Sequence, residues 1–142
     1  MTTLAIVYHS GYGHAAALAD HVAKGAASVG GVSVKTYKAE ELASPDKGPW
    51  AGLANADAII FGAPTYMGSA SAPMKQFMDA SSKVWAGQGW KDKIAAGFTV
   101  SASQSGDKLS TLMQRKKRDK RRARVIRPMT GALHIARECP CE

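Results

Sequence analysis

Hydrophobic positions along the chain fall into short apolar runs separated by longer amphipathic segments. Three runs, at residues 3–9, 58–63 and 94–100, read TLAIVYH, AIIFGA and IAAGFTV. Nearly continuous apolar runs of this length are typical of strands that are covered on both faces of a parallel sheet. Residues 32–38, VSVKTYK, alternate apolar and polar positions instead, which predicts a strand nearer the edge of the sheet.

Helical periodicity predicts the segments between these strands. The first segment ends at Gly30-Gly31, and its apolar face consists of Ala15, Leu18, Ala19, Val22 and Ala26. Before the third strand, the prolines and glycines of residues 45–52 leave room only for a short helix near residues 52–55. The order of strands and helices therefore predicts an α/β fold with a doubly wound parallel sheet and right-handed crossovers.

Two further helices are expected after the third and fourth strands. Pro73 is placed to be the first residue of one helix, whose shared face consists of Met74, Phe77, Met78, Ser81 and Trp85. Asp107 is a candidate N-cap of the other helix, whose apolar face begins with Leu109, Leu112 and Met113. The next positions on that face are Lys116 and Lys117, so the apolar pattern stops in mid-helix.

Charge divides the chain into two parts. The whole chain has a formal net charge of +8, yet residues 1–114 hold nine lysines, no arginine and eight acids, a net charge of +1. Residues 115–142 hold three lysines, seven arginines and three acids, a net charge of +7, together with both cysteines. We therefore expect a near-neutral domain over residues 1–114 and a basic tail over residues 115–142 that is partly helical or disordered.

Composition also narrows the class of protein. No apolar run is long enough to cross a bilayer, and the N-terminal residues lack the pattern of a signal peptide, so we expect a cytoplasmic protein. Cys139 and Cys141 are separated by one residue, too close for an easy mutual bridge, and are interpreted as free thiols. His9, His14 and His21 share a region without the grouping of metal ligands, so no metal site is expected.

The first candidate site follows the first strand, at residues 10–15, SGYGHA. In open α/β sheets, ligands bind outside the carboxyl ends of the strands. The glycines allow a tight turn, Ser10 adds a hydroxyl donor, and the N–H groups at the helix start can bind a phosphate. No Gly-Lys-Ser/Thr sequence follows, which excludes a nucleoside-triphosphatase P-loop.

A dinucleotide site is the rival interpretation of the same turn. The spacing Gly11-x-Gly13-x-x-Ala16 matches the glycine pattern of dinucleotide-binding proteins. That pattern requires an acid at the end of the second strand. Glu40 and Glu41 lie slightly past that position, so the match is loose.

Two further segments lie at the ends of later strands. Residues 62–73, GAPTYMGSASAP, form an expected loop that offers backbone polar groups, the Thr65 hydroxyl and the apolar walls of Tyr66 and Met67. A flat heteroaromatic ring with amide-like edges needs this mixture of groups. Residues 100–108, VSASQSGDK, are small and rich in hydroxyl groups, and they can close over the far edge of the same ligand.

Five segments together resemble a known family: YHSGYGH, FGAPTYMGS, MKQFMD, VWAGQGW and IAAGFTVSAS. They are similar to the flavodoxin-like NAD(P)H:quinone oxidoreductases, and within these to the multimeric flavodoxins of the tryptophan-repressor-binding-protein type. The resemblance extends over about residues 3–114. It implies FMN as cofactor, NAD(P)H as electron donor, a quinone as acceptor and a homo-oligomer, with the flavin supplying the chemistry.

The resemblance also implies roles for individual residues. The FMN phosphate would be held by Ser10, Gly11, Tyr12, Gly13, His14 and Ala15. The isoalloxazine would contact Pro64, Thr65, Tyr66, Met67 and Gly68, and its other edge would contact Val100, Ser101, Ala102, Ser103, Gln104 and Ser105. Tyr12 would lie near the nicotinamide. Trp85, on the loop after the third helix, would line the substrate side of the pocket, with core packing as the equal alternative.

The tail departs from this family. The family adds a fifth strand, with a histidine near the nicotinamide and quinone, and a last helix, and neither is recognisable after Gln114. We therefore expect a flavodoxin-like sheet that lacks both, and we interpret residues 115–142 as a different reading frame. The alternatives are an electron-carrying flavodoxin without its own NAD(P)H site, an inactive truncated product, and non-specific binding of nucleic acid through residues Arg115 to Arg124.

Overall fold

A parallel sheet forms the centre of the molecule. The computed structural model describes residues 1–104 and 106–116. Its main strands are β1 (Thr2–Tyr8), β2 (Val32–Lys38), β3 (Ala58–Tyr66) and β5 (Ile94–Val100), arranged side by side in the order β2, β1, β3, β5. The two-residue strand β4 (Ser69–Ala70) pairs antiparallel with the end of β3. The four predicted strands and their parallel direction are confirmed.

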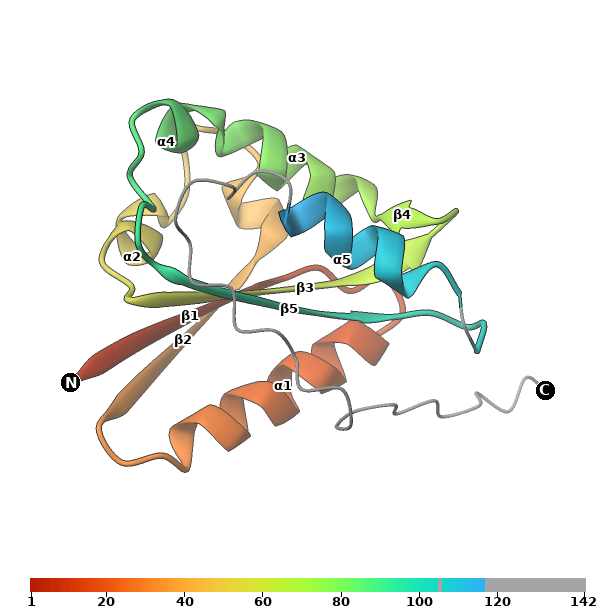
Figure 1. Ribbon diagram of the computed structural model, residues 1–142, viewed down its shortest axis with the longest axis horizontal. Helices are drawn as coiled ribbons and strands as arrows, with labels where there is room; N and C mark the ends of the chain where they lie inside the picture. The colour runs from red at the N-terminus through yellow and green to blue at the C-terminus, as the bar shows by residue number, and fades with distance from the viewer. Residues whose placement is uncertain (105, 117–142) are drawn as a thin grey trace.

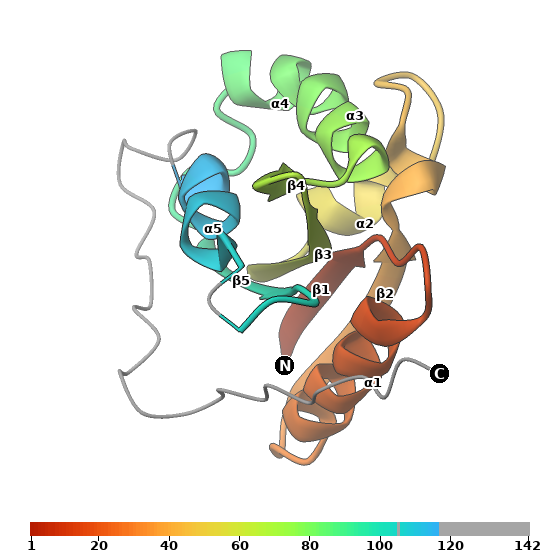
Figure 2. The same ribbon diagram turned by 90° about the vertical axis from the view of Figure 1, so that its right-hand side faces the viewer.

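Helices cover both faces of this sheet (Figure 1). On one face lies α1 (His14–Ala27). The other face carries α2 (Trp50–Ala54), α3 (Ala72–Ala80), α4 (Ser82–Ala86) and α5 (Lys108–Lys116), and Figure 2 shows the same layers from a second side. A 3₁₀ turn, η1 (Ala39–Leu42), follows β2. The described residues therefore form the predicted doubly wound α/β fold.

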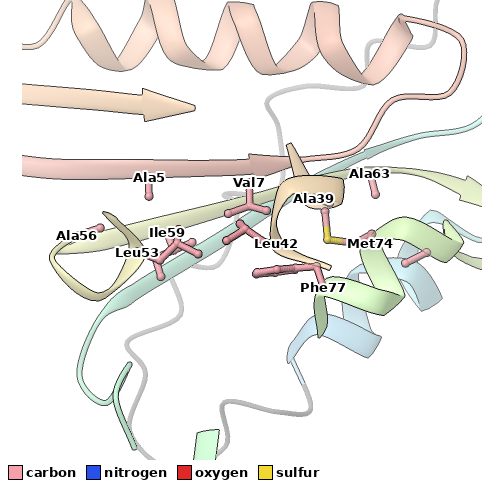
Figure 3. Packing of buried hydrophobic residues seen from close by; sticks show 11 residues of the cluster. Ala5, Val7, Ala39, Leu42, Leu53, Ala56, Ile59, Ala63, Met74 and Phe77 are labelled. Carbon is pink, nitrogen blue, oxygen red and sulfur yellow. The ribbon is translucent and has the colours of Figure 1, made fainter. Parts of the chain in front are cut away.

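The position of β1 in the sheet explains why its residues are almost continuously apolar. Successive side chains of a strand point to opposite faces, so Leu4 and Ile6 pack with Ala19 of α1, whereas Ala5 and Val7 enter the core on the other face. Figure 3 shows that second core, where Val7 lies near Leu42 and Ile59 and close to Met74 and Phe77 of α3. Both faces of β1 are therefore buried, as its apolar run predicted.

The predicted helix over residues 73–85 is two helices in the structure. The helix α3 begins at Ala72, which makes Pro73 its second residue rather than its first, and Ser81 separates it from α4. The Ser81 hydroxyl donates to the carbonyl of Met78 at 2.7 Å. Because the chain turns here, Met74 and Phe77 are buried while Trp85 is 65% exposed on α4. Trp85 therefore does not share the buried face of Met74 and Phe77 that the helical spacing predicted for it. It also lies in α4 and not on the loop after the helix that the family resemblance implied.

The helix after β5 is found where Asp107 predicted it, but its buried face is different. The side chains of Leu109 and Met113 are 74% and 44% exposed, whereas Thr111 is completely buried. The hydroxyl of Thr111 lies 2.9 Å from that of Thr65 on β3. A polar contact therefore sets the orientation of α5, and of the expected apolar face Leu109 and Met113 are exposed while Leu112 is half-buried.

Strand β5 is packed closely against β3. Gly62 of β3 pairs with Phe98 of β5, and a Cβ atom at Gly62 would overlap the Phe98 ring. Within residues 1–104 and 106–116, β5 has a strand neighbour only on its β3 side. The predicted absence of a fifth strand and last helix, and the predicted form of the tail beyond Lys116, concern residues outside the described ones.

Candidate functional site

Three segments expected to form a site lie at one end of the sheet. Because β1, β3 and β5 are parallel, their carboxyl ends lie at the same edge (Figure 1). The crevice between β1 and β3 is where the connections switch from one face of the sheet to the other, and such switch points are where open α/β sheets bind ligands. The turn before α1, the β3–β4 hairpin and the segment after β5 therefore share one edge.

The turn before α1 is held by its own backbone and by Ser10. Gly13 is the N-cap residue of α1 and has a left-handed backbone, with φ of 91°. The Ser10 side-chain oxygen accepts a hydrogen bond of 3.0 Å from the Gly13 N–H, so it shapes the turn while its own hydroxyl hydrogen can still be donated. A Cβ atom at Gly13 would meet no atom within 4 Å, which shows open space beside the turn.

The start of α1 suits an anion. His14 is the first residue of the helix, and no acidic residue lies in its first turn. Helix N-termini present N–H groups without an intrahelical partner and carry the positive end of the helix dipole. Ala15 is 2% exposed, so only its backbone N–H can serve a ligand. These features fit a phosphate group at residues 10–15.

The second segment is a strand end and a tight hairpin, not the expected long loop. Pro64 and Thr65 belong to β3, and Thr65 pairs with Ala70 of β4. Met67 and Gly68 form the tip with φ of 48° and 74°. The Met67 side chain is fully exposed and Tyr66 is 39% exposed. The hairpin thus presents an apolar wall at the edge of the sheet.

A chain of threonine hydroxyls lies beneath this wall. The Thr99 hydroxyl donates to the Ala63 carbonyl at 2.7 Å. The hydroxyls of Thr65 and Thr99 are 2.8 Å apart, and those of Thr65 and Thr111 are 2.9 Å apart. Since each hydroxyl has one hydrogen and Thr99 donates to Ala63, Thr65 donates to Thr99, and the Thr111 hydrogen is shared between Thr65 and the Asp107 carbonyl, which lies 3.3 Å away. The Thr65 hydroxyl is therefore committed to the protein and joins β3, β5 and α5.

Hydrogen bonds from Lys108 hold the segment after β5, residues 100–104. Its first residues are Val100, at the end of β5, and Ser101, whose hydroxyl donates to the carbonyl of Ser103 at 2.9 Å. The Lys108 ammonium donates to the carbonyls of Ser103 and Gln104 at 2.9 and 2.8 Å. Ala102 is exposed, and Ser105 lies outside the described residues. The segment is thus held open to solvent beside the hairpin.

Tyrosine side chains connect the first two segments. The rings of Tyr12 and Tyr66 meet edge to face, with centroids 6.5 Å apart and an interplanar angle of 79°. Tyr12 is 85% exposed. The structure thus brings the predicted turn and the predicted hairpin into contact.

Among the predicted site residues that the structure describes, Trp85 alone is not brought to this edge. It belongs to α4, and Figure 1 shows α4 at the opposite end of the sheet from the hairpin. The predicted place of Trp85 in the flavin pocket is therefore not formed within one chain.

A hollow of about 230 Å³ adjoins the turn on the β2 side. It is lined by Tyr8, Ser10, Gly13, Ala16, Lys38 and Glu40. Glu40 also lies 3.5 Å from Nε2 of His9, whose Nδ1 is 2.7 Å from the Ser71 hydroxyl. Glu40 is the candidate for the acid that the dinucleotide pattern requires. It lies past the end of β2 in sequence, but the fold brings it beside the turn.

Several residues of this edge were missed by sequence reasoning. The missed residues are His9, Ser71, Thr99, Thr111 and Lys108, all of which bond across segments distant in sequence or hold the segment after β5. No pattern in the sequence singled out Thr111, because it lies on a different side of the helix from Leu109 and Met113. Within residues 1–104 and 106–116, no group of three His, Cys, Asp or Glu side chains could hold a metal ion. Among the same residues, no helix has the length and apolar character needed to span a bilayer.

This fold and edge define a flavodoxin-like α/β protein. The sequence matches the family described as NADPH-dependent FMN reductase over residues 9–137. That match extends past Gln114 into the basic tail. The chain belongs to the NADPH-dependent FMN reductase family.

Two curated relatives and one solved structure are similar to the chain. Flavodoxin FldP of Pseudomonas aeruginosa is 39% identical over 80% of this chain and 58% of its own length. An NAD(P)H dehydrogenase (quinone) of Trichlorobacter lovleyi is 35% identical over 79% of this chain and 64% of its own length. The structure of a flavodoxin, WrbA-like protein from Agrobacterium tumefaciens has a TM-score of 0.70 and 45% identity, covering 83% of this chain and 71% of that one.

The similarity confirms the family predicted from the sequence motifs. The curated relatives are longer than this chain, which spans 58% of one and 64% of the other. What those whole proteins do is therefore a basis for a proposal about this chain.

Proposed function

We propose that this chain binds FMN at the carboxyl edge of its sheet and transfers electrons from NAD(P)H to a quinone. The observation that carries the proposal is the turn at residues 10–15. It combines a left-handed Gly13, the Ser10 hydroxyl and the start of a 14-residue helix without acids in its first turn. Similarity to an NAD(P)H dehydrogenase (quinone) supports the same activity.

The edge offers a suitable group for each part of FMN. The backbone N–H groups at the start of α1 and the Ser10 hydroxyl would bind the phosphate. The ring would lie between the hairpin tip and the segment after β5, against Pro64, Tyr66 and Met67, with backbone groups of residues 100–104 at its other edge. Thr65, whose hydroxyl is already bonded to Thr99 and Thr111, would support the hairpin from below.

The two substrates would use the exposed side of the same edge. When bound, FMN supplies the redox chemistry, accepting a hydride from NAD(P)H and passing two electrons to a quinone. Tyr12 and Met67 are 85% and fully exposed, and they would give flat substrates an apolar surface to lie against. Trp85 has no place in a site made by one chain, so its proposed role on the substrate side requires a second copy.

Spectroscopy tests the proposal directly. Purified full-length chain is titrated with FMN, and the visible spectrum is recorded before and after anaerobic addition of NADH or NADPH. We expect a shifted flavin spectrum, bleaching by at least one of the two nucleotides, and recovery of the absorbance when a quinone is added. If the visible spectrum of FMN does not change when the chain is added, the proposal is wrong.

An electron-carrying flavodoxin is the second candidate. The similarity to flavodoxin FldP, with 39% identity, favours it. In that case the chain would bind FMN as above, but neither nucleotide would bleach the bound flavin at a useful rate. A chemical reductant such as dithionite would bleach it in both cases, so comparison of the two reductants separates the candidates.

The remaining parts of the proposal concern the cell and the assembly. We place the protein in the cytoplasm and infer a homo-oligomer, in keeping with the exposed Trp85, Leu109 and Met113. Gel filtration with light scattering and cell fractionation test these two points. Residues 115–142 stay interpreted as a different reading frame, which sequencing of the coding region in independent isolates tests.

A further inference from the structure

Tyr66 extends from the hairpin back onto the turn before α1. A Cβ atom built on Gly11 would lie 2.6 Å from the Tyr66 hydroxyl oxygen and 3.6 Å from the ring carbon that carries it. A carbon 2.6 Å from an oxygen is a steric clash. The hydroxyl therefore reaches the turn only because residue 11 has no side chain.

Glycine is needed at residue 11 to make room for the Tyr66 hydroxyl, and not to allow an unusual backbone conformation. Among the described glycines, those with positive φ are Gly13, Gly31, Gly48, Gly68 and Gly106. The backbone of Gly11 is thus open to alanine, and what a methyl group would meet there is the Tyr66 hydroxyl. Tyr12, the next residue, packs its ring edge to face with that of Tyr66, which holds the phenol beside the turn.

We propose that the Tyr66 hydroxyl is a phosphate-binding group, which donates to the phosphate of a flavin bound at residues 10–15. This rests on the proposed FMN site and assigns the Tyr66 hydroxyl a phosphate contact in addition to the isoalloxazine contact of its ring that is expected from the family. The turn itself contains no lysine or arginine, and Ser10 already accepts the Gly13 N–H. A phenol O–H beside the turn supplies an added neutral donor, and hydrogen bonds to charged acceptors are the stronger class.

The consequence is selectivity for FMN over riboflavin. The two flavins share the isoalloxazine and the ribityl chain and differ in the phosphate. A hydroxyl that bonds the phosphate therefore stabilises bound FMN and leaves bound riboflavin unaffected. A hydroxyl that simply closes over the turn would instead hinder FMN.

The experiment compares both flavins on full-length wild type and Tyr66→Phe, by quenching of flavin fluorescence. We expect the Kd for FMN to rise about tenfold or more in Y66F, the loss typical of one hydrogen bond to a charged group. The Kd for riboflavin should stay within about twofold. Tyr37→Phe, which makes the same chemical change at a hydroxyl that lies against Gly52 of α2, is the matched control and should change neither value.

Gly11→Ala tests the contact from the other side. In the wild-type background the new methyl displaces the Tyr66 hydroxyl, so G11A should weaken FMN about as much as Y66F does. In the Y66F background the nearest atom would be the ring carbon at 3.6 Å, an ordinary contact. The double variant G11A/Y66F should therefore bind FMN no worse than Y66F alone, because both changes remove one interaction.

The outcomes distinguish the role of Tyr66 from the existence of the FMN site. If wild type binds FMN but Y66F binds it equally well or more tightly, the role of Tyr66 is wrong and the FMN site stands. Equal loss of FMN and riboflavin in Y66F, or additive losses in G11A and Y66F, would also overturn that role. If wild type does not bind FMN, the proposed function itself fails, and the role of Tyr66 with it. Urea denaturation of each variant shows whether folding has changed.

Discussion

The turn before α1 and the hairpin side of the same edge are built in different ways. The turn is local: Ser10 and Gly13 are three residues apart, and one left-handed glycine with one side-chain hydrogen bond gives it its shape. The hairpin side is assembled from Thr65, Thr99 and Thr111, which are separated by 34 and 46 residues along the chain. The hydrogen bond that shapes the turn is local, whereas the hydroxyl chain exists only when β3, β5 and α5 are all in place.

The largest effect is expected from Thr99→Val, which breaks the hydroxyl chain in its middle. Valine removes the donor to the Ala63 carbonyl and the acceptor for Thr65. Leaving buried polar groups without partners costs about 1–3 kcal/mol, so we expect a loss of about 2 kcal/mol in the free energy of unfolding by urea denaturation. Thr111→Val removes only the donor at the end of the chain and should cost about half as much.

Thr99→Ser is the control for T99V, since it keeps the hydroxyl and loses only a methyl group. It should retain most of the stability that T99V loses. If T99S and T99V are equally unstable, packing rather than hydrogen bonding holds the hairpin side, and the comparison drawn above is wrong.

Gly13→Ala should have a smaller effect of purely local origin. A side chain in the left-handed region costs about 1–2 kcal/mol, and the new methyl at residue 13 would touch nothing, so we expect the lower end, about 1 kcal/mol. Gly25→Ala, inside α1 and also without neighbours, should instead stabilise by about 0.5–1 kcal/mol. Thermal or urea unfolding gives both signs in one experiment.

The double variant G13A/T99V sharpens the comparison. The two residues share no hydrogen-bond partner, so their losses of stability should add to within about 0.5 kcal/mol. A clearly non-additive result would mean that the local turn and the long-range hairpin side are energetically coupled.

The smallest effect is expected from Lys108→Met, which removes the ammonium that bonds the carbonyls of Ser103 and Gln104. Because this contact lies at the surface, the loss of global stability should be about 0.5 kcal/mol or less. The segment after β5 should nevertheless be cleaved faster by a protease under native conditions. Unchanged cleavage would show that the lysine does not hold the segment.

The same contrast explains which parts of the structure the sequence could predict. The strands at residues 32–38 and 94–100 match β2 and β5 in the structure, since apolar runs and alternation are local signals. The turn at residues 10–15 was predicted for the same reason. The hairpin was missed because Pro64 and Gly68 indicate a loop, and the pairing of Thr65 with Ala70 depends on the surrounding fold.

Side-chain placement was less predictable than the elements themselves. Trp85 was placed on the same helix face as Met74 and Phe77 because it continues the helical spacing, but a turn at Ser81 breaks that spacing. Thr111 was overlooked between Leu109 and Met113, because apolar residues are the usual basis for choosing a buried face. Its burial depends on partners on β3, and the reach of Tyr66 to Gly11 likewise could not be deduced from spacing.

The close fit of Phe98 over Gly62 limits how this protein can change during evolution. Since a Cβ atom at residue 62 would overlap the aromatic ring, Gly62 cannot gain a side chain while Phe98 is present without disturbing the pairing of β3 with β5. A lineage that acquires alanine or serine at residue 62 must first, or at the same time, acquire a smaller side chain at residue 98. The two positions, 36 residues apart, are thus coupled in one direction: a change at residue 98 opens residue 62 to larger side chains, whatever selection on flavin binding requires.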